Sequence, residues 1–297
     1  MTASDPETGP EGDEGGGRPF QRVETALRLR LADGTYRKGD MLPSQRTLAR
    51  DLRVSRDTVQ NVLKALAEEG WITSRQGSGS RVLKVPSAAT PQGRPQLYNF
   101  MHDAFWQSEV SLDVSALTGE SFVGLFDLQV GRVEAEEIAP RRVRVRMMLP
   151  SEDMDLLYPR AWDPKDGRVH RRWRNRARMN VADMNDFCER LRAKGVDAGL
   201  EVHRVPWTPQ FKLYIVNDAD ALVGFYSPVR GPIRLEDGMS IVDAVDVKGV
   251  GATLHHHPRP KEENARQGSY FADCRDWFDS NWDRLAKQPK SGRNEAG

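Results

Sequence analysis

The segment LPSQRTLARDLRVSRDTVQNVLKALAEEG, residues 42–70, contains two helical patterns joined by a short turn. Ser44 and Ser55 each precede one pattern, where a serine oxygen accepts a hydrogen bond from a free backbone N–H of the first helical turn. Gly70 closes the second pattern, because glycine readily takes the left-handed conformation beyond a helix end. We therefore expect two helices, one from Ser44 to about Leu52 and one from Ser55 to the residue before Gly70.

A third helix before this segment and a β-hairpin after it complete the unit. The helix is indicated by apolar residues at steps of three and four, namely Phe20, Val23, Leu27 and Leu31. Residues 71–75 and 80–83 flank the turn sequence QGSG at 76–79, as two strands flank a hairpin tip. Three helices followed by a hairpin predict an α+β winged helix-turn-helix over residues 20–85.

Positive charge is concentrated in the same part of the chain. Residues 18–85 carry 14 basic and seven acidic side chains, whereas the whole chain has a formal net charge of +1. Residues 1–17 carry five acidic and no basic side chains. A basic surface on one small domain is typical of polyanion binding, so any nucleic-acid contact is expected within residues 20–85.

These residues, in this order, resemble the DNA-binding domain of the GntR family of bacterial transcription regulators. The resemblance is carried by LPSQRTLA at 42–49, VSRDTV at 54–59 and LKALAEEG at 63–70. It implies a sequence-specific regulator that binds double-stranded DNA as a homodimer on a pseudo-palindromic operator. The candidate DNA-binding residues are Arg46, Ser55, Arg56, Thr58, Gln60, Arg75, Gln76 and Gly77.

Arg56 is the strongest candidate for reading a base. Together with Ser55 and Thr58 it lies at the start of the recognition helix, where free N–H groups and the helix dipole favour phosphate and where side chains first reach base edges. Two residues depart from the family pattern. Gln45 stands where the family usually has Glu, and Gln60 where it often has Arg. A different operator sequence is therefore expected.

Composition divides the remainder of the chain. Residues 1–19 and 288–297 are expected to be disordered tails, and PSAATPQGRPQ at 86–96 is expected to be a linker because it is rich in proline and has no apolar face. Residues 97–287 mix strand and helix patterns and predict an α/β domain for effector binding or dimerisation. The expected strands are 141–149, 200–205, 211–216 and 221–226, and the expected helices are 181–194 and 270–285.

A degenerate motif in this second domain resembles that of the phospholipase D superfamily. The family pattern is H-x-K, then D after four residues and G after six more, and here Gln210, Lys212, Asn217 and Gly224 take these positions. The resemblance implies a phospholipase D-like sensor with an effector site at Gln210, Lys212 and Asn217, in which Lys212 anchors an anion. An amide nitrogen has no available lone pair, so Gln210 excludes nucleophilic catalysis at this position. An unrelated α/β sensor, including the chorismate-lyase-like type, is the alternative.

Three further features bear on chemistry. The basic run RVHRRWRNRAR at 168–178 is expected to be a charged loop or exposed strand, with an anion site or an extended DNA contact as the alternatives. The histidines at 255–257 cannot all point the same way on a strand, so no metal site is expected. Cys188 and Cys274 lack the spacing of a metal or redox pair and are expected to be buried thiols. No cofactor is expected.

Together these features predict a non-enzymatic regulator, with repression as the default because a dimer over a promoter obstructs polymerase. An unidentified small-molecule effector on the second domain would change the spacing of the two recognition helices. A DNA-targeted phosphodiesterase or nuclease is the alternative that Gln210 disfavours, and an architectural DNA-binding protein without ligand is another. Neither a membrane-length apolar run nor a secretory signal pattern is present, so we expect a cytoplasmic protein without a membrane partner.

Overall fold

The computed structural model describes residues 18–32, 36–52, 54–68, 70–75, 79–83, 96–235, 240–247, 253–262 and 268–287. Residues 1–17 and 288–297, which were expected to be tails, lie outside these ranges, as do residues 84–95 of the linker region and the wing-tip residues Gln76 and Gly77. The first helix begins at Arg18, so residues 18 and 19 belong to a helix and not to the expected N-terminal tail. Proline is tolerated there because the first turn of a helix makes no use of its missing N–H.

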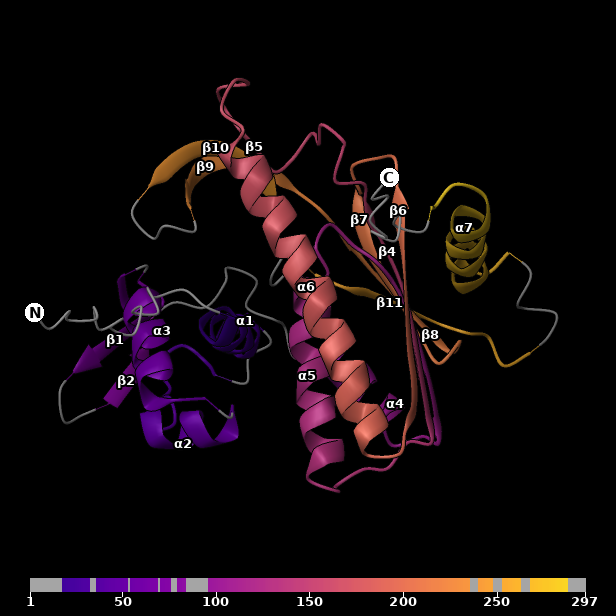
Figure 1. The fold of residues 1–297 in the computed structure, drawn as a ribbon, viewed down its shortest axis with the longest axis horizontal. Coiled ribbons are helices and arrows are strands. Elements are labelled where there is room, and N and C mark those ends of the chain that lie inside the picture. Colours follow the sequence, from indigo (N-terminus) through magenta and orange to yellow (C-terminus); the bar gives the residue numbers. More distant parts are fainter. Residues whose placement is uncertain are drawn as a thin grey trace, which may run out of the picture.

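Residues 18–82 form the expected winged helix-turn-helix (Figure 1). Its elements are α1 (Arg18–Ala32), α2 (Gln45–Asp51), α3 (Arg56–Glu68), β1 (Ile72–Arg75) and β2 (Gly79–Val82). One apolar core joins the three helices and the hairpin, and it includes the buried side chains of Leu27, Leu48, Val59, Leu66 and Ile72. This core fixes the orientation of α3 with respect to the other elements.

The local signals at the ends of α2 and α3 behave as the sequence predicted. The backbone N–H of Thr47 donates to Ser44 Oγ at 3.1 Å, and the N–H of Thr58 donates to Ser55 Oγ at 3.1 Å. Beyond α3, Gly70 has a φ of 74°, the left-handed conformation expected there. Each helix therefore begins at its serine, and α3 ends before its glycine.

The hairpin of the wing has an additional neighbour that the sequence did not indicate. Met41 pairs with Arg81 of β2 in an isolated antiparallel bridge, and the N–H of Leu42 donates to the carbonyl oxygen of Ser80 at 2.8 Å. The segment before α2 therefore ties the wing to the helix-turn-helix.

A six-stranded mixed sheet is the centre of the C-terminal region. Its strand order is β11-β8-β7-β3-β4-β6, in which β3, β4 and β6 run parallel and β7, β8 and β11 pair antiparallel with their neighbours. The strands are β3 (Glu109–Ser115), β4 (Arg142–Pro150), β6 (Asp197–Val205), β7 (Phe211–Val216), β8 (Asp220–Phe225) and β11 (His255–Pro258). The four strands expected from the sequence correspond to β4, β6, β7 and β8.

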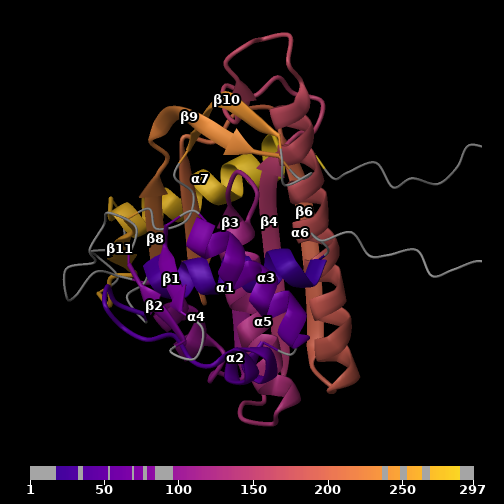
Figure 2. The same ribbon diagram turned by 90° about the vertical axis from the view of Figure 1, so that its left-hand side faces the viewer.

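Helices cover both faces of this sheet (Figures 1 and 2). On one face lie α4 (Leu97–Ala104), α5 (Glu120–Glu134) and α6 (Arg168–Ala193), and on the other lies α7 (Tyr270–Arg284). A smaller sheet of β5 (Arg160–Ala161), β10 (Ile241–Val247) and β9 (Pro228–Arg234), in that order, lies beside the N-terminal end of α6. The C-terminal region is thus the expected α/β domain, and its likeness to phospholipase D stays a prediction.

The expectation for residues 168–178 was wrong, because these residues form the first half of α6 and not a loop or exposed strand. The inward face of α6 carries Val169, Trp173 and Ala177, all buried, and the arginines occupy the other faces. Steps of four between these apolar residues were a helix signal that the density of arginine obscured. Cys188 and Cys274 are both buried, as expected. No helix in the described part of the chain has the length and apolar character of a membrane span.

The order of the strands creates a point of divergence beside β3. From β3 the chain passes through α5 to β4 and through α6 to β6, all on one side, and then returns to the other side of β3 as β7. In open α/β sheets, ligands bind at the carboxyl ends of the strands at such a switch point. The carboxyl end of β3 is therefore the first place to search the C-terminal domain for a ligand site.

Candidate functional site

One face of α3 is exposed and entirely polar. Val59, Val62, Leu63 and Leu66 lie in the core, so the opposite side of the helix faces outward. The outward side is formed by Arg56, Asp57, Gln60, Asn61 and Lys64. Asn61 and Lys64 were not among the predicted DNA contacts, although helical periodicity places them on this side once the four apolar residues are assigned to the core.

Ser55 and Thr58 have a structural role at the start of α3. Ser55 Oγ accepts from the N–H of Thr58, and the two hydroxyl oxygens lie 2.8 Å apart. Only one hydroxyl proton is used between the two side chains, so one remains available to donate to a phosphate oxygen. The pair can therefore cap the helix and contact DNA at the same time.

Arg46 on α2 and Arg56 on α3 are exposed, and neither guanidinium forms an ion pair with any described residue. Other arginines of the same domain are engaged: Arg50 lies 3.2 Å from Asp51, and Arg28 lies 3.0 Å from Glu24. An unpaired guanidinium can present its planar set of donors to a phosphate or to the edge of a guanine. Arg46 and Arg56 are therefore two side chains in the described part of this domain that can contact an external anion.

The wing contributes a two-stranded antiparallel ribbon whose last pair is Arg75 opposite Gly79. Arg75 is placed by its backbone alone, and Gln76 and Gly77 lie outside the described residues, so these three contacts stay predictions. Arg81 on the next strand donates to the carbonyl oxygen of Gly39 at 3.0 Å. That arginine therefore stabilises the base of the wing.

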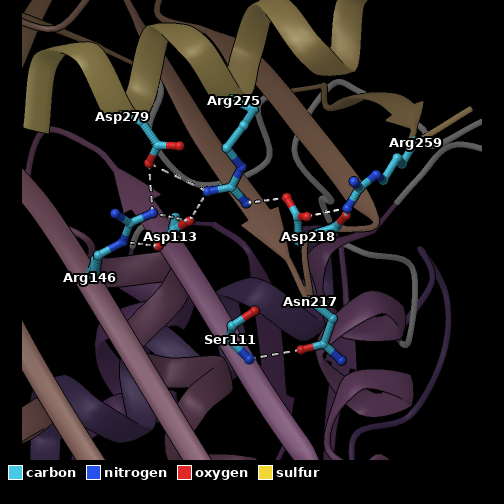
Figure 3. Close-up of polar contacts among 8 residues, drawn as sticks. All are labelled: Ser111, Asp113, Arg146, Asn217, Asp218, Arg259, Arg275 and Asp279. Atoms are coloured by element: carbon cyan, nitrogen blue, oxygen red, sulfur yellow. Dashed lines mark hydrogen bonds and ion pairs between the residues drawn. The ribbon is translucent and has the colours of Figure 1, made fainter. Parts of the chain in front are cut away.

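The three predicted effector residues are not brought together. Gln210 lies exposed just before β7, Lys212 is buried within it, and Asn217 follows its other end. The separation of Lys212 and Asn217 along the strand is roughly 16 Å at the usual rise. Asn217 shapes the turn after β7: it has a φ of 50°, and its Oδ1 accepts from the N–H of Ser111 at 2.8 Å (Figure 3). Only Lys212 occupies a buried position suited to holding a charged group.

Lys212 lies on the face of the sheet that α5 and α6 cover, with an exposed fraction of 5%. It is opposite Gly224 of β8, and a Cβ at residue 224 would lie 3.2 Å from Lys212 Cε. Burial lowers the pKa of Lys212 to about 8, and the negative charge of Glu120 partly offsets that effect. Lys212 is thus a desolvated cation beside the carboxyl end of β3.

Glu120 is the common neighbour of several charged groups at this end of the sheet. It opens α5 directly after β3, and its Oε1 accepts from Arg176 of α6 at 2.6 Å. Its charge also acts on Lys212 of β7 and on Asp246 of β10, whose pKa is raised chiefly by burial. Charged side chains of four elements therefore influence one another near the carboxyl end of β3, which the sequence indicated only through Lys212.

A second charged network fastens α7 to the opposite face of the sheet (Figure 3). Asp113 of β3 accepts from Arg146 Nε at 2.6 Å and from Arg146 Nη2 at 2.8 Å, and it also pairs with Arg275 of α7. Arg146 reaches Asp279 at 2.9 Å, and Arg275 reaches Asp218 at 3.0 Å. Apart from the buried Nε of Arg275, which has no hydrogen-bond partner among the described residues, these groups pair with one another, so this network is structural.

The consecutive histidines lie on the edge strand β11 and point different ways. His256 Nε2 lies 2.6 Å from Asp220 Oδ1, His255 contacts the ring of Phe225, and His257 contacts the ring of Tyr270. Among the described residues no three or more His, Cys, Asp or Glu side chains are grouped as metal ligands would be.

Comparison with known proteins identifies relatives of the N-terminal domain. Residues 19–82 match the family described as "Bacterial regulatory proteins, gntR family". The chain is 36% identical over 66 residues to the "Exu regulon transcriptional regulator" of Escherichia coli (strain K12), covering 22% of this chain and 26% of that protein. It is 43% identical over 67 residues to the "Probable transcriptional regulator PhnF" of the same strain, covering 23% and 27%.

A solved structure is also similar to part of the chain. It is described as "S. agalactiae BusR in complex with its busAB-promotor DNA" and is 32% identical, with a TM-score of 0.22, covering 23% of this chain and 33% of that chain. This chain spans about a quarter of the length of the two Escherichia coli relatives.

Proposed function

We propose, from the gntR-family DNA-binding domain that residues 19–82 form, that the whole chain is a sequence-specific transcription regulator. The observation that carries the proposal is the exposed polar face of α3, which begins with Arg56, whose guanidinium forms no ion pair with a described residue. A recognition helix reads bases through side chains at its N-terminal end, and arginine pairs with guanine through two hydrogen bonds.

The remaining side chains of this face have complementary roles in the proposal. Gln60 follows Arg56 by one helical turn, and an amide side chain pairs with adenine. Lys64, one turn further, supplies a charge for a phosphate, as does Arg46 on α2. The operator half-site is then read by Arg56 and Gln60 and held by the two other cations.

The chain acts as a homodimer on a pseudo-palindromic operator in this proposal, with an effector on the C-terminal domain changing the spacing of the two recognition helices. The expected effect on transcription is repression, because a dimer bound over a promoter obstructs polymerase. The cytoplasm is the expected location, since the proposed DNA ligand lies there. No catalytic step is assigned: Gln210 cannot form a phosphohistidine, and it lies apart from Asn217 at the other end of β7.

The test is binding of the purified full-length protein to sheared genomic DNA of its host, followed by sequencing of the retained fragments. Wild type should enrich a short inverted repeat, and Arg56→Ala should not. Arg284→Ala is the matched control, because it removes the same charge from the exposed end of α7, on the far side of the sheet. Enrichment of the same repeat by the Arg56 variant, or no repeat with wild type, would overturn the proposal.

A further inference from the structure

Three basic side chains around the recognition helix are left without a carboxylate partner by the described fold. Arg46, Arg56 and Lys64 are exposed, and none of them forms an ion pair with a described residue. In the C-terminal domain many arginines do pair with carboxylates, among them Arg146 with Asp113 and Arg190 with Glu134. The surface around α3 is therefore open to a negatively charged partner.

An acidic segment directly precedes this domain in the chain. Residues 1–17 carry five acidic and no basic side chains, whereas residues 18–85 carry 14 basic and seven acidic ones. The segment joins α1 at Arg18, and α1 packs against α3 in the core of the winged helix. The acidic side chains are Asp5, Glu7, Glu11, Asp13 and Glu14. Opposite charges are thus attached to one another by the covalent chain.

The acidic segment has enough residues to reach the exposed face of α3. An extended chain covers about 3.3 Å per residue, so residues 1–17 can span roughly 56 Å. A folded unit of about 65 residues has a radius of gyration of roughly 11 Å, so its whole surface lies within that span. Attachment to the same chain also keeps the local concentration of these carboxylates high, whatever the concentration of the protein.

We propose that residues 1–17 bind the exposed face of α3 in the DNA-free protein, with their carboxylates near Arg46, Arg56 and Lys64 in place of DNA phosphates. Ion pairs between exposed side chains are individually weak and are screened by salt, so DNA displaces the segment and is not excluded by it. The effect on operator binding rests on the proposed function, whereas the contact itself can be measured without DNA.

Two properties of DNA binding follow from this contact. Because the acidic segment stabilises only the DNA-free protein, it lowers the affinity for the operator and for random DNA by the same factor. Because salt weakens the contact of the segment as well as that of DNA, the loss of affinity is largest at low salt and shrinks as the salt concentration rises. The segment therefore limits the occupancy of non-operator DNA without changing base preference.

The first experiment compares wild type with a full-length variant in which the five carboxylates become amides. Its substitutions are Asp5→Asn, Glu7→Gln, Glu11→Gln, Asp13→Asn and Glu14→Gln. Both proteins are titrated with labelled random-sequence DNA at several salt concentrations. We expect the variant to bind about three- to tenfold more tightly at low salt, the sum of several weak ion pairs, with a steeper dependence on salt. An unchanged Kd at low salt would overturn the inference.

A second variant controls for net charge. It neutralises five exposed carboxylates of the C-terminal domain, through Asp153→Asn, Asp186→Asn, Glu262→Gln, Asp276→Asn and Asp283→Asn. The change in net charge is the same, but the acidic segment is intact, so the Kd for random DNA should stay close to that of wild type. An equal gain of affinity in the two variants would show a general effect of charge and would also overturn the inference.

A measurement without DNA locates the contact. A nitroxide label is attached at Thr8→Cys, since Cys188 and Cys274 are buried, and broadening of backbone amide NMR signals is recorded at low salt. Signals of Arg56 and Lys64 should broaden more than in the labelled chain whose five carboxylates are amides, which has the same attachment point. Equal broadening in the two chains would refute the contact. Failure of wild type to select any DNA sequence, with the excess broadening present, refutes the proposed function and leaves the contact standing.

Discussion

The side chain of Lys212 runs against Gly224, its partner on the neighbouring strand, at a place where no larger residue fits. A Cβ at residue 224 would lie 2.9 Å from Leu254 Cδ2 and 3.2 Å from both Lys212 Cε and the carbonyl oxygen of Thr253. The backbone oxygen cannot move as a side-chain end can. The missing side chain of Gly224 therefore leaves the space that the buried side chain of Lys212 occupies.

Gly224→Ala should lower the free energy of unfolding by about 1–3 kcal/mol, the usual cost of overpacking a well-filled site. Gly231→Ala on β9 is the matched control, because a Cβ there meets no atom within 4 Å. Urea denaturation of both variants measures the difference. Equal stability of the two variants would show that the space beside Lys212 adapts without cost.

Lys212→Met should change how stability depends on pH. The pKa of Lys212 is about 8 in the folded protein and 10.5 in its ordinary environment, so between these values the unfolded chain binds a proton that the folded chain does not. Wild type therefore gains stability as pH rises through this window, and below pH 8 it carries the full cost of the buried ammonium. We expect the variant to exceed wild type by roughly 1–3 kcal/mol at pH 7.

The measurement is urea unfolding of wild type and Lys212→Met at several values from pH 7 to pH 10. The advantage of the variant should shrink steadily above pH 8. Lys194→Met, which removes an exposed lysine, is measured in the same way as the reference. If the difference in unfolding free energy between Lys212→Met and wild type were the same at every pH, the buried lysine would not be the group that titrates.

Arg56 and Lys64 should affect DNA binding in different ways. Arg56→Ala should weaken operator binding by about 1–3 kcal/mol and relax the base preference at one position of each half-site. Lys64→Ala should weaken binding to all sequences alike and reduce the steepness of the salt dependence by about one unit of log Kd per log salt. Titrations of labelled operator and of scrambled DNA at several salt concentrations separate the two effects. A sequence-independent loss in Arg56→Ala would move this residue from base reading to phosphate contact.

Asp113→Asn should destabilise the C-terminal domain by about 2–3 kcal/mol, because it leaves Arg146 and Arg275 without their shared carboxylate in a mostly buried place. Asp197→Asn is the comparison: its carboxylate also pairs with two arginines, Arg142 and Arg144, but on an exposed edge. Solvent screens the charges at that site, so the Asp197→Asn variant should be almost as stable as wild type. Urea unfolding followed by circular dichroism measures the stability of both variants. Similar losses of unfolding free energy in the two would contradict the argument from burial.

The winged helix was predictable because its signals are local. Ser44, Ser55 and Gly70 mark helix ends through hydrogen bonds and backbone conformations that involve only near neighbours. The core positions follow from helical periodicity for the same reason. What the sequence could not provide was the bridge between Met41 and Arg81, since residues so far apart are paired by the tertiary fold alone.

The C-terminal site was predictable only in part. Lys212 stood out because it fits the spacing of the phospholipase D motif, but the same motif joined it to Asn217, which lies at the opposite end of the strand. Glu120, Arg176 and Asp246 were not identified, because they lie 92, 36 and 34 residues from Lys212 in sequence and are brought near by strand order. Residues 168–178 were wrongly predicted to be a loop or strand, because the many arginines concealed three apolar residues at steps of four, Val169, Trp173 and Ala177.

Helix α6 spans the height of the sheet in a single piece, 26 residues or about 39 Å in length. Arg176 lies nearer one end of this rod, and about 26 Å of helix extends beyond it to Ala193. A tilt of about 5° at Arg176 would therefore shift the far end by roughly 2 Å, as a lever magnifies movement near its pivot. A displacement of α6 at its contact with Glu120 would thus be larger at the surface formed by the last turns of the helix.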